Sequence, residues 1–191
     1  MTVLQAIILG IVQGISEFIP ISSSAHLVIT PFLLGWNLPA KEAFVFNVLV
    51  QVATLVGVMV YFREDLSRIT RSIWHSLPRK DFHYDPHTRL GWLILLATIP
   101  AVLIGLLLLG VVEQVFNSPV ASAGFLLVTA VLLLFAEKVG KRTRVLEELD
   151  AKDAIWIGFA QALAIFPGIS RSGSTITGGM ARDLQRPAAA K

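Results

Sequence analysis

Three long uncharged apolar segments restrict the fold of this chain more than any other feature. They cover residues 43–62, 92–112 and 118–136, which are 20, 21 and 19 residues long. A helix needs roughly 20 apolar residues to cross a hydrocarbon core about 30 Å thick. Charged residues make up only 15% of the 191 residues, whereas soluble domains carry about 25%. The chain is therefore predicted to be an all-α polytopic membrane protein forming a single membrane domain.

An internal repeat is the second informative feature. Residues 6–27 and 154–175 align without a gap at an offset of 148 positions, and 8 of the 22 pairs are identical. Each copy runs from an apolar helical pattern into a break rich in Pro and Ser, which does not suit one straight transmembrane helix. Irregular backbone at membrane depth occurs only where protein buries it or water lines it. We therefore predict a re-entrant helical hairpin over residues 1–35 and a second over residues 154–176.

Basic residues in the connecting segments predict the orientation. Residues 63–91 hold six Lys or Arg and residues 137–153 hold five, whereas residues 113–117 hold none. Cytoplasmic loops carry such an excess, so both long connectors are predicted to be cytoplasmic. Three crossings between the copies make the repeats inverted, and inverted broken helices typically meet near the membrane midplane. The net charge of +3 belongs to these connectors, and no nucleic-acid partner is expected.

Ionisable side chains in the two copies predict a shared site. Gln13 and Glu17 are four residues apart and lie on one face of a helix. A carboxylate at the bilayer centre costs about 2.5–3.5 kcal/mol, so Glu17 needs a partner or a task. Arg171 in the second copy supplies either a structural ion pair with Glu17 or one half of a functional site, and the residues alone leave both interpretations open.

Serine-rich segments follow the break in each copy. Ser22, Ser23 and Ser24 are predicted to start a helix in the first copy, as are Ser170 and Ser172 in the second. Two such helix starts with Arg171 between them favour a phosphate-like anion. Small residues such as Ser24, Ser172 and Gly173 serve equally well for close helix packing.

His26 follows Ser23 by three residues at the predicted helix start. This spacing allows both side chains to face one cavity, which is the arrangement that an activated oxygen nucleophile requires. A lone His in an apolar segment is more often a hydrogen-bonded structural residue, and that alternative stays open.

The two copies together resemble the bacterial undecaprenyl-diphosphate phosphatase family, also known as the bacitracin-resistance family. The resemblance rests on the segments Gln13–Glu17, Ser22–His26 and Pro167–Thr175, which match the family's Glu/Gln-x-x-x-Glu and Pro-Gly-x-Ser-Arg-Ser-Gly-x-Thr motifs in order and spacing. It implies an integral membrane hydrolase that converts undecaprenyl diphosphate to the monophosphate, recycles the lipid carrier for cell-wall polymers and confers resistance to bacitracin. It also implies a divalent cation, Mg²⁺ or Ca²⁺, and location in the bacterial plasma membrane with the site open to the outer side.

From the residues and this resemblance together we assign roles to the matching positions. Glu17, Ser23, His26 and Arg171 are the expected catalytic residues, and Glu17 is also the expected metal ligand. Ser23 is the candidate nucleophile, with direct attack by water as the competing route. Expected substrate-binding residues are Gln13, Ser22, Ser24, Ser170, Ser172, Gly173 and Thr175. The expected partners are a polyprenyl diphosphate and membrane lipids, and a homodimer is left open.

Two features depart from the family pattern. Gln13 stands where many members carry a second carboxylate, so a metal would be held by Glu17, the diphosphate and waters. Members continue through further membrane segments after the second hairpin, so the chain is expected to be C-terminally truncated.

Other functions stay open from the sequence. Inverted hairpins are also typical of secondary transporters, so a flippase or transporter for an anionic lipid or solute is the main alternative. A membrane scaffold with a structural Glu17–Arg171 pair is another. Asp81, His83, Asp85 and His87 could suggest a metal site, but their polar connector favours a solvated loop.

Overall fold

The computed structural model describes residues 1–78, 81, 85–115 and 118–191 of the chain. The described part is helical apart from turns and a single isolated bridge between Arg144 and Leu184. In chain order the helices are α1 (Val3–Phe18), α2 (Ser23–Leu33), α3 (Ala40–Tyr61), α4 (Arg63–Ser76), α5 (Pro86–Leu107), α6 (Leu109–Val115), α7 (Pro119–Val139), η1 (Leu146–Glu148), α8 (Ala151–Ala162), η2 (Leu163–Ile165), α9 (Arg171–Ala181) and α10 (Arg186–Ala190).

Helices α3, α5 and α7 are long and apolar enough to cross a membrane, with 22, 22 and 21 residues. They confirm the all-α polytopic class. The predicted spans 43–62 and 118–136 overlap α3 and α7, whereas the predicted span 92–112 runs past the end of α5 at Leu107 into α6. No residue of α3 is fully buried, as expected for a helix that presents most of its surface to lipid. The half-buried residues of α3 include Asn47, Val50 and Thr54, which lie on one face and pack against α1.

The boundaries of the spans follow from capping residues. Asp85 accepts a hydrogen bond from the backbone N–H of Thr88 at 2.8 Å, and Pro86 occupies the first turn, so α5 begins six residues before the predicted start at 92. Ser118 caps α7 in the same way, followed by Pro119. The polar ends of these helices are therefore set by side-chain caps, which a hydropathy pattern does not detect.

The connector after α3 is more ordered than the sequence indicated. Residues 63–76 form α4, which packs on α5. Ile69 and Ile73 cover Gly91, where a β-carbon would lie only 2.5 Å from Ile73 Cδ1. Two of the four residues of the metal-site alternative can be accounted for: Asp85 caps the start of α5, and His83 lies outside the described residues. No group of three or more His, Cys, Asp or Glu that could hold a metal ion occurs in the described ranges, and the preference for a solvated loop stays a prediction.

Both copies of the repeat form a helix–break–helix hairpin, α1–α2 and α8–η2–α9. The likeness extends beyond the aligned segments, because α1 and α8 both begin with a reciprocal capping box. Thr2 and Gln5 form the first box, and Asp150 and Asp153 form the second, at the same offset of 148. The predicted hairpins are present as helix pairs, and their re-entrant placement in a membrane stays a prediction.

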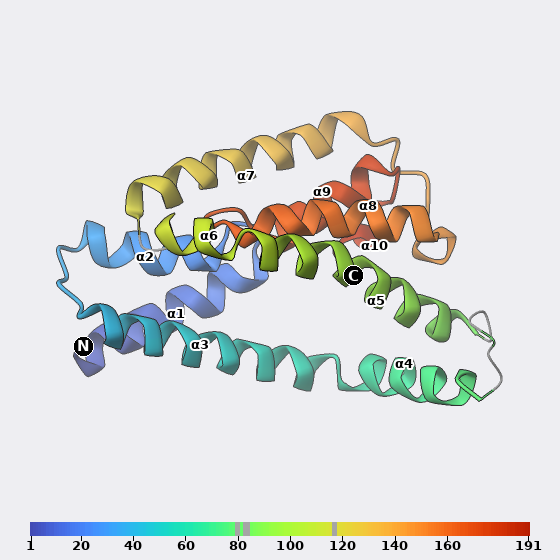
Figure 1. Cartoon of the computed structure of the whole chain (residues 1–191), viewed down its shortest axis with the longest axis horizontal. Helices are drawn as coiled ribbons and strands as arrows, with labels where there is room; N and C mark the ends of the chain where they lie inside the picture. Colours follow the sequence, from blue (N-terminus) through green and yellow to red (C-terminus); the bar gives the residue numbers. More distant parts are fainter. Residues whose placement is uncertain (79–80, 82–84, 116–117) are drawn as a thin grey trace.

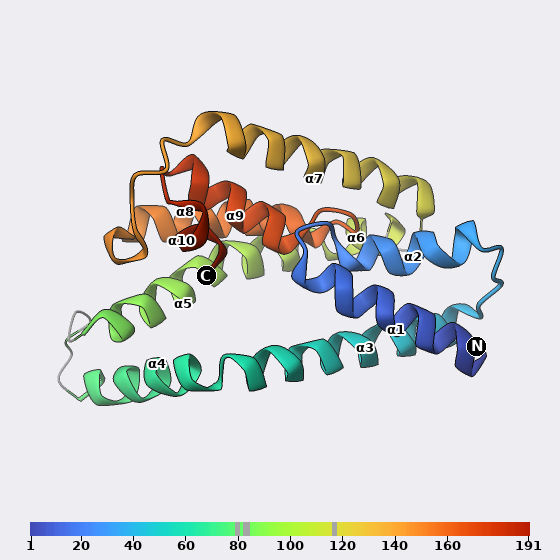
Figure 2. The same ribbon diagram turned by 180° about the vertical axis from the view of Figure 1, so that it is seen from behind.

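Figures 1 and 2 show how the hairpins are arranged. Helix α7 runs along one side of the molecule and α3 with α4 along the other, with the hairpins between them. The two hairpins point toward each other along the long axis, so their breaks meet in the middle of the molecule. Helices α2 and α9 both pack on α7, while α8 packs on α5.

Candidate active site

The first hairpin gathers polar side chains around Glu17 at its break. Ser23 Oγ donates a hydrogen bond to Glu17 Oε2, and Gln13 Nε2 donates to the same oxygen at 3.0 Å. Pro20 follows the end of α1, and Ser22 adopts a left-handed φ of 65°, which turns the chain back. The turn places the first residue of α2 against the last turn of α1. Glu17, Ser23 and Gln13 are therefore brought together as predicted.

His26 lies beside this group but bonds elsewhere. Its Nδ1 lies 2.8 Å from the carbonyl oxygen of Ser22, and because a carbonyl only accepts, Nδ1 carries the proton. In the neutral ring the other nitrogen, Nε2, is the acceptor. The hydroxyl of Ser23 is bonded to Glu17, so the expected Ser23–His26 pair is replaced by a Ser23–Glu17 pair. Among the described groups, Glu17 is the one positioned to take the proton of Ser23.

Helix α9 begins with a capped serine. Ser170 Oγ accepts a hydrogen bond from the backbone N–H of Gly173 at 3.1 Å. Ser170 Oγ and Ser172 Oγ are 3.2 Å apart, and Ser22 Oγ and Ser24 Oγ in the first copy are separated by the same 3.2 Å. Thr175 donates its hydroxyl to the helix carbonyls of Arg171 and Ser172. The repeat therefore holds at the level of side-chain pairs, and the substrate-binding roles of these residues stay predictions.

Thr129 of α7 holds the second break in place, and the sequence reasoning missed it. Its hydroxyl donates to the carbonyl of Gly168 at 2.9 Å and accepts from the backbone N–H of Ser170 at 3.0 Å. Gly168 has a φ of 116° and lies so close to α7 that a β-carbon would be 2.5 Å from the carbonyl oxygen of Ser122. Two buried hydroxyls seven residues apart in an apolar span, Ser122 and Thr129, were the available signal.

The two breaks touch each other. A β-carbon on Gly173 would lie 3.3 Å from the carbonyl oxygen of Pro20, so α9 starts directly against the first break. Glu17 and Arg171 lie three and two residues from these contact points in the chain. Within the described residues, however, no ion pair joins Glu17 to Arg171, whose side chain is exposed. The alternative of a structural Glu17–Arg171 pair is therefore not supported.

A groove of about 1000 Å³ runs from the second break. It lies between α3–α4 and the group formed by α5, α8, α9 and α10, and it is lined mostly by apolar side chains. Of the predicted substrate-binding residues, only Ser172 and Thr175 line it, together with Gln161, the repeat counterpart of Gln13. Glu17, Ser23, His26 and Arg171 do not line this groove.

Oxygen donors at the first break suit a hard cation. Gln13 is fully buried, and its Oε1 lacks a hydrogen-bond partner among the residues that the structure describes. Its amide also donates to one oxygen of Glu17, so an amide oxygen and a carboxylate lie in the same small region. Mg²⁺ is commonly held by one or two carboxylates with waters and substrate phosphates. The residues present fit such a cation without a second carboxylate.

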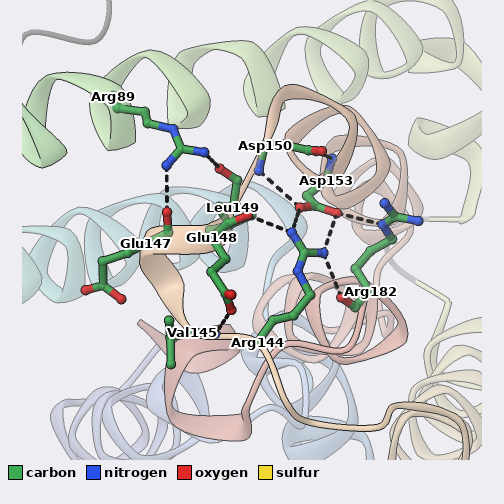
Figure 3. A network of polar contacts seen from close by, with 9 residues as sticks. All are labelled: Arg89, Arg144, Val145, Glu147, Glu148, Leu149, Asp150, Asp153 and Arg182. Atoms are coloured by element: carbon green, nitrogen blue, oxygen red, sulfur yellow. Dashed lines mark hydrogen bonds and ion pairs between the residues drawn. The ribbon is translucent and has the colours of Figure 1, made fainter.

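The base of the second hairpin carries a buried charged cluster that the sequence did not predict (Figure 3). Asp153 has no exposed surface and accepts hydrogen bonds from Arg144 at 2.6 and 3.1 Å and from Arg182 at 2.7 Å. Burial raises the pKa of Asp153, but the hydrogen bonds from Arg144 and Arg182 outweigh it and lower the pKa to about 2.

The segment before α8 is joined to the segment after α9. The backbone N–H of Arg144 donates to the carbonyl of Asp183 at 2.9 Å, and that of Gln185 donates to the carbonyl of Arg144 at 2.8 Å. Gly140 lies against Met180, because a β-carbon on Gly140 would be 2.1 Å from the carbonyl oxygen of Met180. The base of this hairpin is therefore fixed to the end of α7.

Comparison with known proteins identifies the family of this chain. A family model described as "Bacitracin resistance protein BacA" matches residues 6–191. The chain belongs to the BacA family. This confirms the resemblance stated above from the motifs.

Similar relatives are named undecaprenyl-diphosphatase. The protein from Chloroherpeton thalassium is 42% identical over 198 residues, covering 100% of this chain and 69% of the relative. Those from Synechococcus elongatus and Myxococcus xanthus are 42% and 41% identical, covering 98% and 100% of this chain but 65% and 63% of the relatives. The chain thus spans about two thirds of the length of the curated relatives it matches.

Proposed function

We propose that this chain carries the catalytic hairpins of an enzyme that dephosphorylates undecaprenyl diphosphate to undecaprenyl phosphate. The observation that carries the proposal is the contact of the two breaks, where Gly173 meets the carbonyl of Pro20. This contact brings the first break, which holds the Glu17 carboxylate and the Ser23 hydroxyl, against the second break, where α9 starts with Arg171. Membership of the family and the names of its relatives support the same activity. Recycling of the lipid carrier and bacitracin resistance would follow from it.

The setting proposed is the bacterial plasma membrane, with the site facing the outer side. The long apolar helices support a multi-pass membrane protein. The excess of Lys and Arg in the connectors 63–91 and 137–153 supports their cytoplasmic location. The apolar groove beside α9 suits the isoprenoid tail, since most of its lining is hydrocarbon.

Arg171 and the start of α9 would bind the diphosphate. The guanidinium is exposed at the break and forms no ion pair within the described residues, so its donors are available to phosphate oxygens. The positive end of α9 lies at the same break, because Arg171 is the first residue of this helix, and it favours the same charge. Ser170, Ser172, Gly173 and Thr175 are the proposed neighbours of the phosphate groups, and Ser22 and Ser24 approach from the first break.

Gln13 Oε1 and Glu17 would hold a divalent cation, Mg²⁺ or Ca²⁺, together with the diphosphate. When bound, such a cation neutralises charge that develops on the phosphate oxygens.

Ser23 is the proposed nucleophile. Its Oγ would attack the terminal phosphorus as the bond to the bridging oxygen breaks, and the hydroxyl proton would pass to Glu17, to which it already donates. The lipid monophosphate leaves, and water then releases phosphate from Ser23. His26 would use Nε2 to exchange a proton with the leaving group or the water. Direct attack by water, with Ser23 only orienting it, is the competing route.

Release of inorganic phosphate from a short-chain polyprenyl diphosphate in detergent, with and without a chelator, tests the proposal. We expect cation-dependent release, and absence of release under both conditions would contradict it. Rapid quench followed by mass spectrometry separates the two routes, because only nucleophilic attack by Ser23 leaves a phosphoserine.

A second candidate function is movement of an anionic lipid across the membrane. The inverted hairpins that meet in the middle of the molecule favour it. Detergent micelles separate the two functions, because hydrolysis proceeds there and vectorial transport does not.

A further inference from the structure

A hydrogen bond from the third helix reaches the group around Glu17. Gln13 Nε2 donates to Glu17 Oε2 at 3.0 Å and to Thr54 Oγ1 at 3.3 Å, so both amide hydrogens have acceptors. Thr54 lies 41 residues from Gln13, in the middle of α3. It is half-buried on the face of α3 that packs against α1.

The hydroxyl of Thr54 is oriented by its own helix. Its single hydrogen is directed at the carbonyls of Gln51, at 2.9 Å, and Val50, at 3.2 Å. Only the lone pairs of Oγ1 are left for Gln13, so Thr54 accepts from the amide and cannot donate to it. Thr54 therefore selects the NH₂ end of the Gln13 amide.

This selection fixes the other end of the amide. With its NH₂ held between Glu17 and Thr54, Gln13 turns its Oε1 to a buried position without a partner among the described residues. In the flipped orientation Oε1 would face the carboxylate of Glu17, two acceptors against each other. The same flip would bring Oε1 against the Thr54 oxygen, whose hydrogen is already used.

The second copy of the repeat shows that the arrangement is specific. Gln161 is the counterpart of Gln13, but Ile165 stands where Glu17 would be. No hydrogen bond of its amide is found within the described residues, and it is only half-buried along the groove. A glutamine at this repeat position is thus not oriented by the hairpin itself. The carboxylate and the hydroxyl on α3 provide that orientation.

We infer that Thr54 is a positioning residue, which fixes the amide of Gln13 so that Glu17 stays oriented toward Ser23 and Gln13 Oε1 stays available as a ligand oxygen. The inference rests on the proposed function for its effect on turnover. The hydrogen-bonded orientation itself does not depend on that function.

Three variants of the full chain test the inference. Thr54→Val keeps the shape and removes the hydroxyl, and Thr54→Ser restores the hydroxyl. Thr30→Val removes a half-buried hydroxyl from α2 that forms no hydrogen bond to Gln13 within the described residues. The first readout is the pair of Gln13 side-chain amide protons in protein labelled with ¹⁵N-glutamine, assigned with Gln13→Leu. One resonance is expected to move upfield in Thr54→Val, with both unchanged in Thr54→Ser and Thr30→Val.

The second readout is phosphate release from a short-chain polyprenyl diphosphate at saturating cation. Loss of an outer partner of a ligand side chain typically lowers activity by about 10- to 100-fold. We expect a loss of that size in kcat for Thr54→Val, with a smaller change in KM and recovery in Thr54→Ser. Thr30→Val should match the parent.

The two readouts separate the possible failures. Unchanged Gln13 amide resonances in Thr54→Val would overturn the inference whatever the turnover. An upfield shift without any phosphate release from the parent chain would support the orientation by Thr54 and reject the proposed function. An equal kcat for Thr54→Val and the parent, in a chain that hydrolyses the substrate, would overturn the positioning role.

Discussion

The two hairpins share a backbone plan but differ in where their charges lie. The first has a neutral capping box of Thr2 and Gln5 at its base and a carboxylate at its break. The second has a buried Asp153 bound by two arginines at its base, and Arg171 exposed at its break. A duplicated unit has thus kept its turns and serine pairs while its ionisable groups diverged. The comparison indicates that the breaks are chemically complementary. It also shows a buried carboxylate bound by two arginines at the base of the second hairpin, whereas the base of the first hairpin holds the Met1–Glu42 ion pair.

The largest effect is expected from removing the cation at the second break. Arg171→Ala should lower kcat by about 100- to 1000-fold, the usual cost of losing one donor that stabilises developing charge. Lys41→Ala, at an exposed position of α3, is the matched control. Phosphate release by purified variants measures both. Turnover of Arg171→Ala close to the control would show that the breaks are not complementary in function.

The bases of the two hairpins should differ in how much they contribute to the free energy of unfolding. Asp153→Ala leaves two arginines without their buried partner, and we expect a loss of about 3 kcal/mol in the free energy of unfolding. The loss is at the lower end of the usual range because Arg144 and Arg182 keep contact with solvent. Gln5→Ala, at the repeat-equivalent position, should cost about 1 kcal/mol or less. Unfolding in mixed detergents compares the variants, and equal losses would remove the distinction between the bases.

Lowering the pH should destabilise the base of the second hairpin, around Asp153, more than the base of the first. The pKa of Asp153 is held at about 2 in the folded chain, below its usual 3.8, because Arg144 and Arg182 bind its ionised form more strongly than burial penalises it. This contribution of about 2 kcal/mol is fully present above pH 4 and is lost as the pH falls through 2. Unfolding of the parent and of Asp153→Asn between pH 5 and pH 2 measures it. A parent chain whose stability follows that of Asp153→Asn over this range would contradict the assignment.

The smallest effect concerns the contact between the breaks. A β-carbon on Gly173 would lie 3.0 Å from Ser170 Cβ and 3.3 Å from the carbonyl oxygen of Pro20, so Gly173→Ala should displace the breaks slightly at a cost of about 1 kcal/mol. Its repeat counterpart is Ala25, and Ala25→Gly should cost about 0.5–1 kcal/mol through helix propensity. Only Gly173→Ala is expected to reduce kcat as well. Comparison of melting and turnover for the pair checks this, and a parallel loss of turnover in Ala25→Gly would weaken the role of the contact.

Most of the fold could be predicted from the sequence because hydropathy and the repeat are strong local signals. The three spans and the two hairpins follow from apolar length and from Pro, Gly and Ser at the breaks. The helix α4 carries Leu66, Ile69 and Ile73 at helical spacing, a signal that the prediction of a loop passed over. The packing of Ile69 and Ile73 on Gly91 of another helix is what the sequence does not indicate.

The candidate site was predictable in its members but not in its pairing. Glu17, Ser23 and Gln13 come together as expected, yet Ser23 bonds to Glu17 rather than to His26 because Ser22 adopts a left-handed conformation. Thr129 reaches the second break from a distant helix, and no spacing rule within the hairpins points to it. The cluster around Asp153 was missed because its arginines come from two distant segments, Arg144 from the connector before α8 and Arg182 from the end of α9.

The backbone bonds between Arg144 and the segment after α9 bear on how the chain can move. Because α7, the connector and both ends of the second hairpin are joined there, these parts should travel as one rigid body. Any hinge that separates the two breaks would then have to lie near the first hairpin, whose base is held by the Met1–Glu42 ion pair and has no counterpart of the buried Asp153 cluster among the described residues. Rocking of the first hairpin against a stationary second one is the motion that this construction permits.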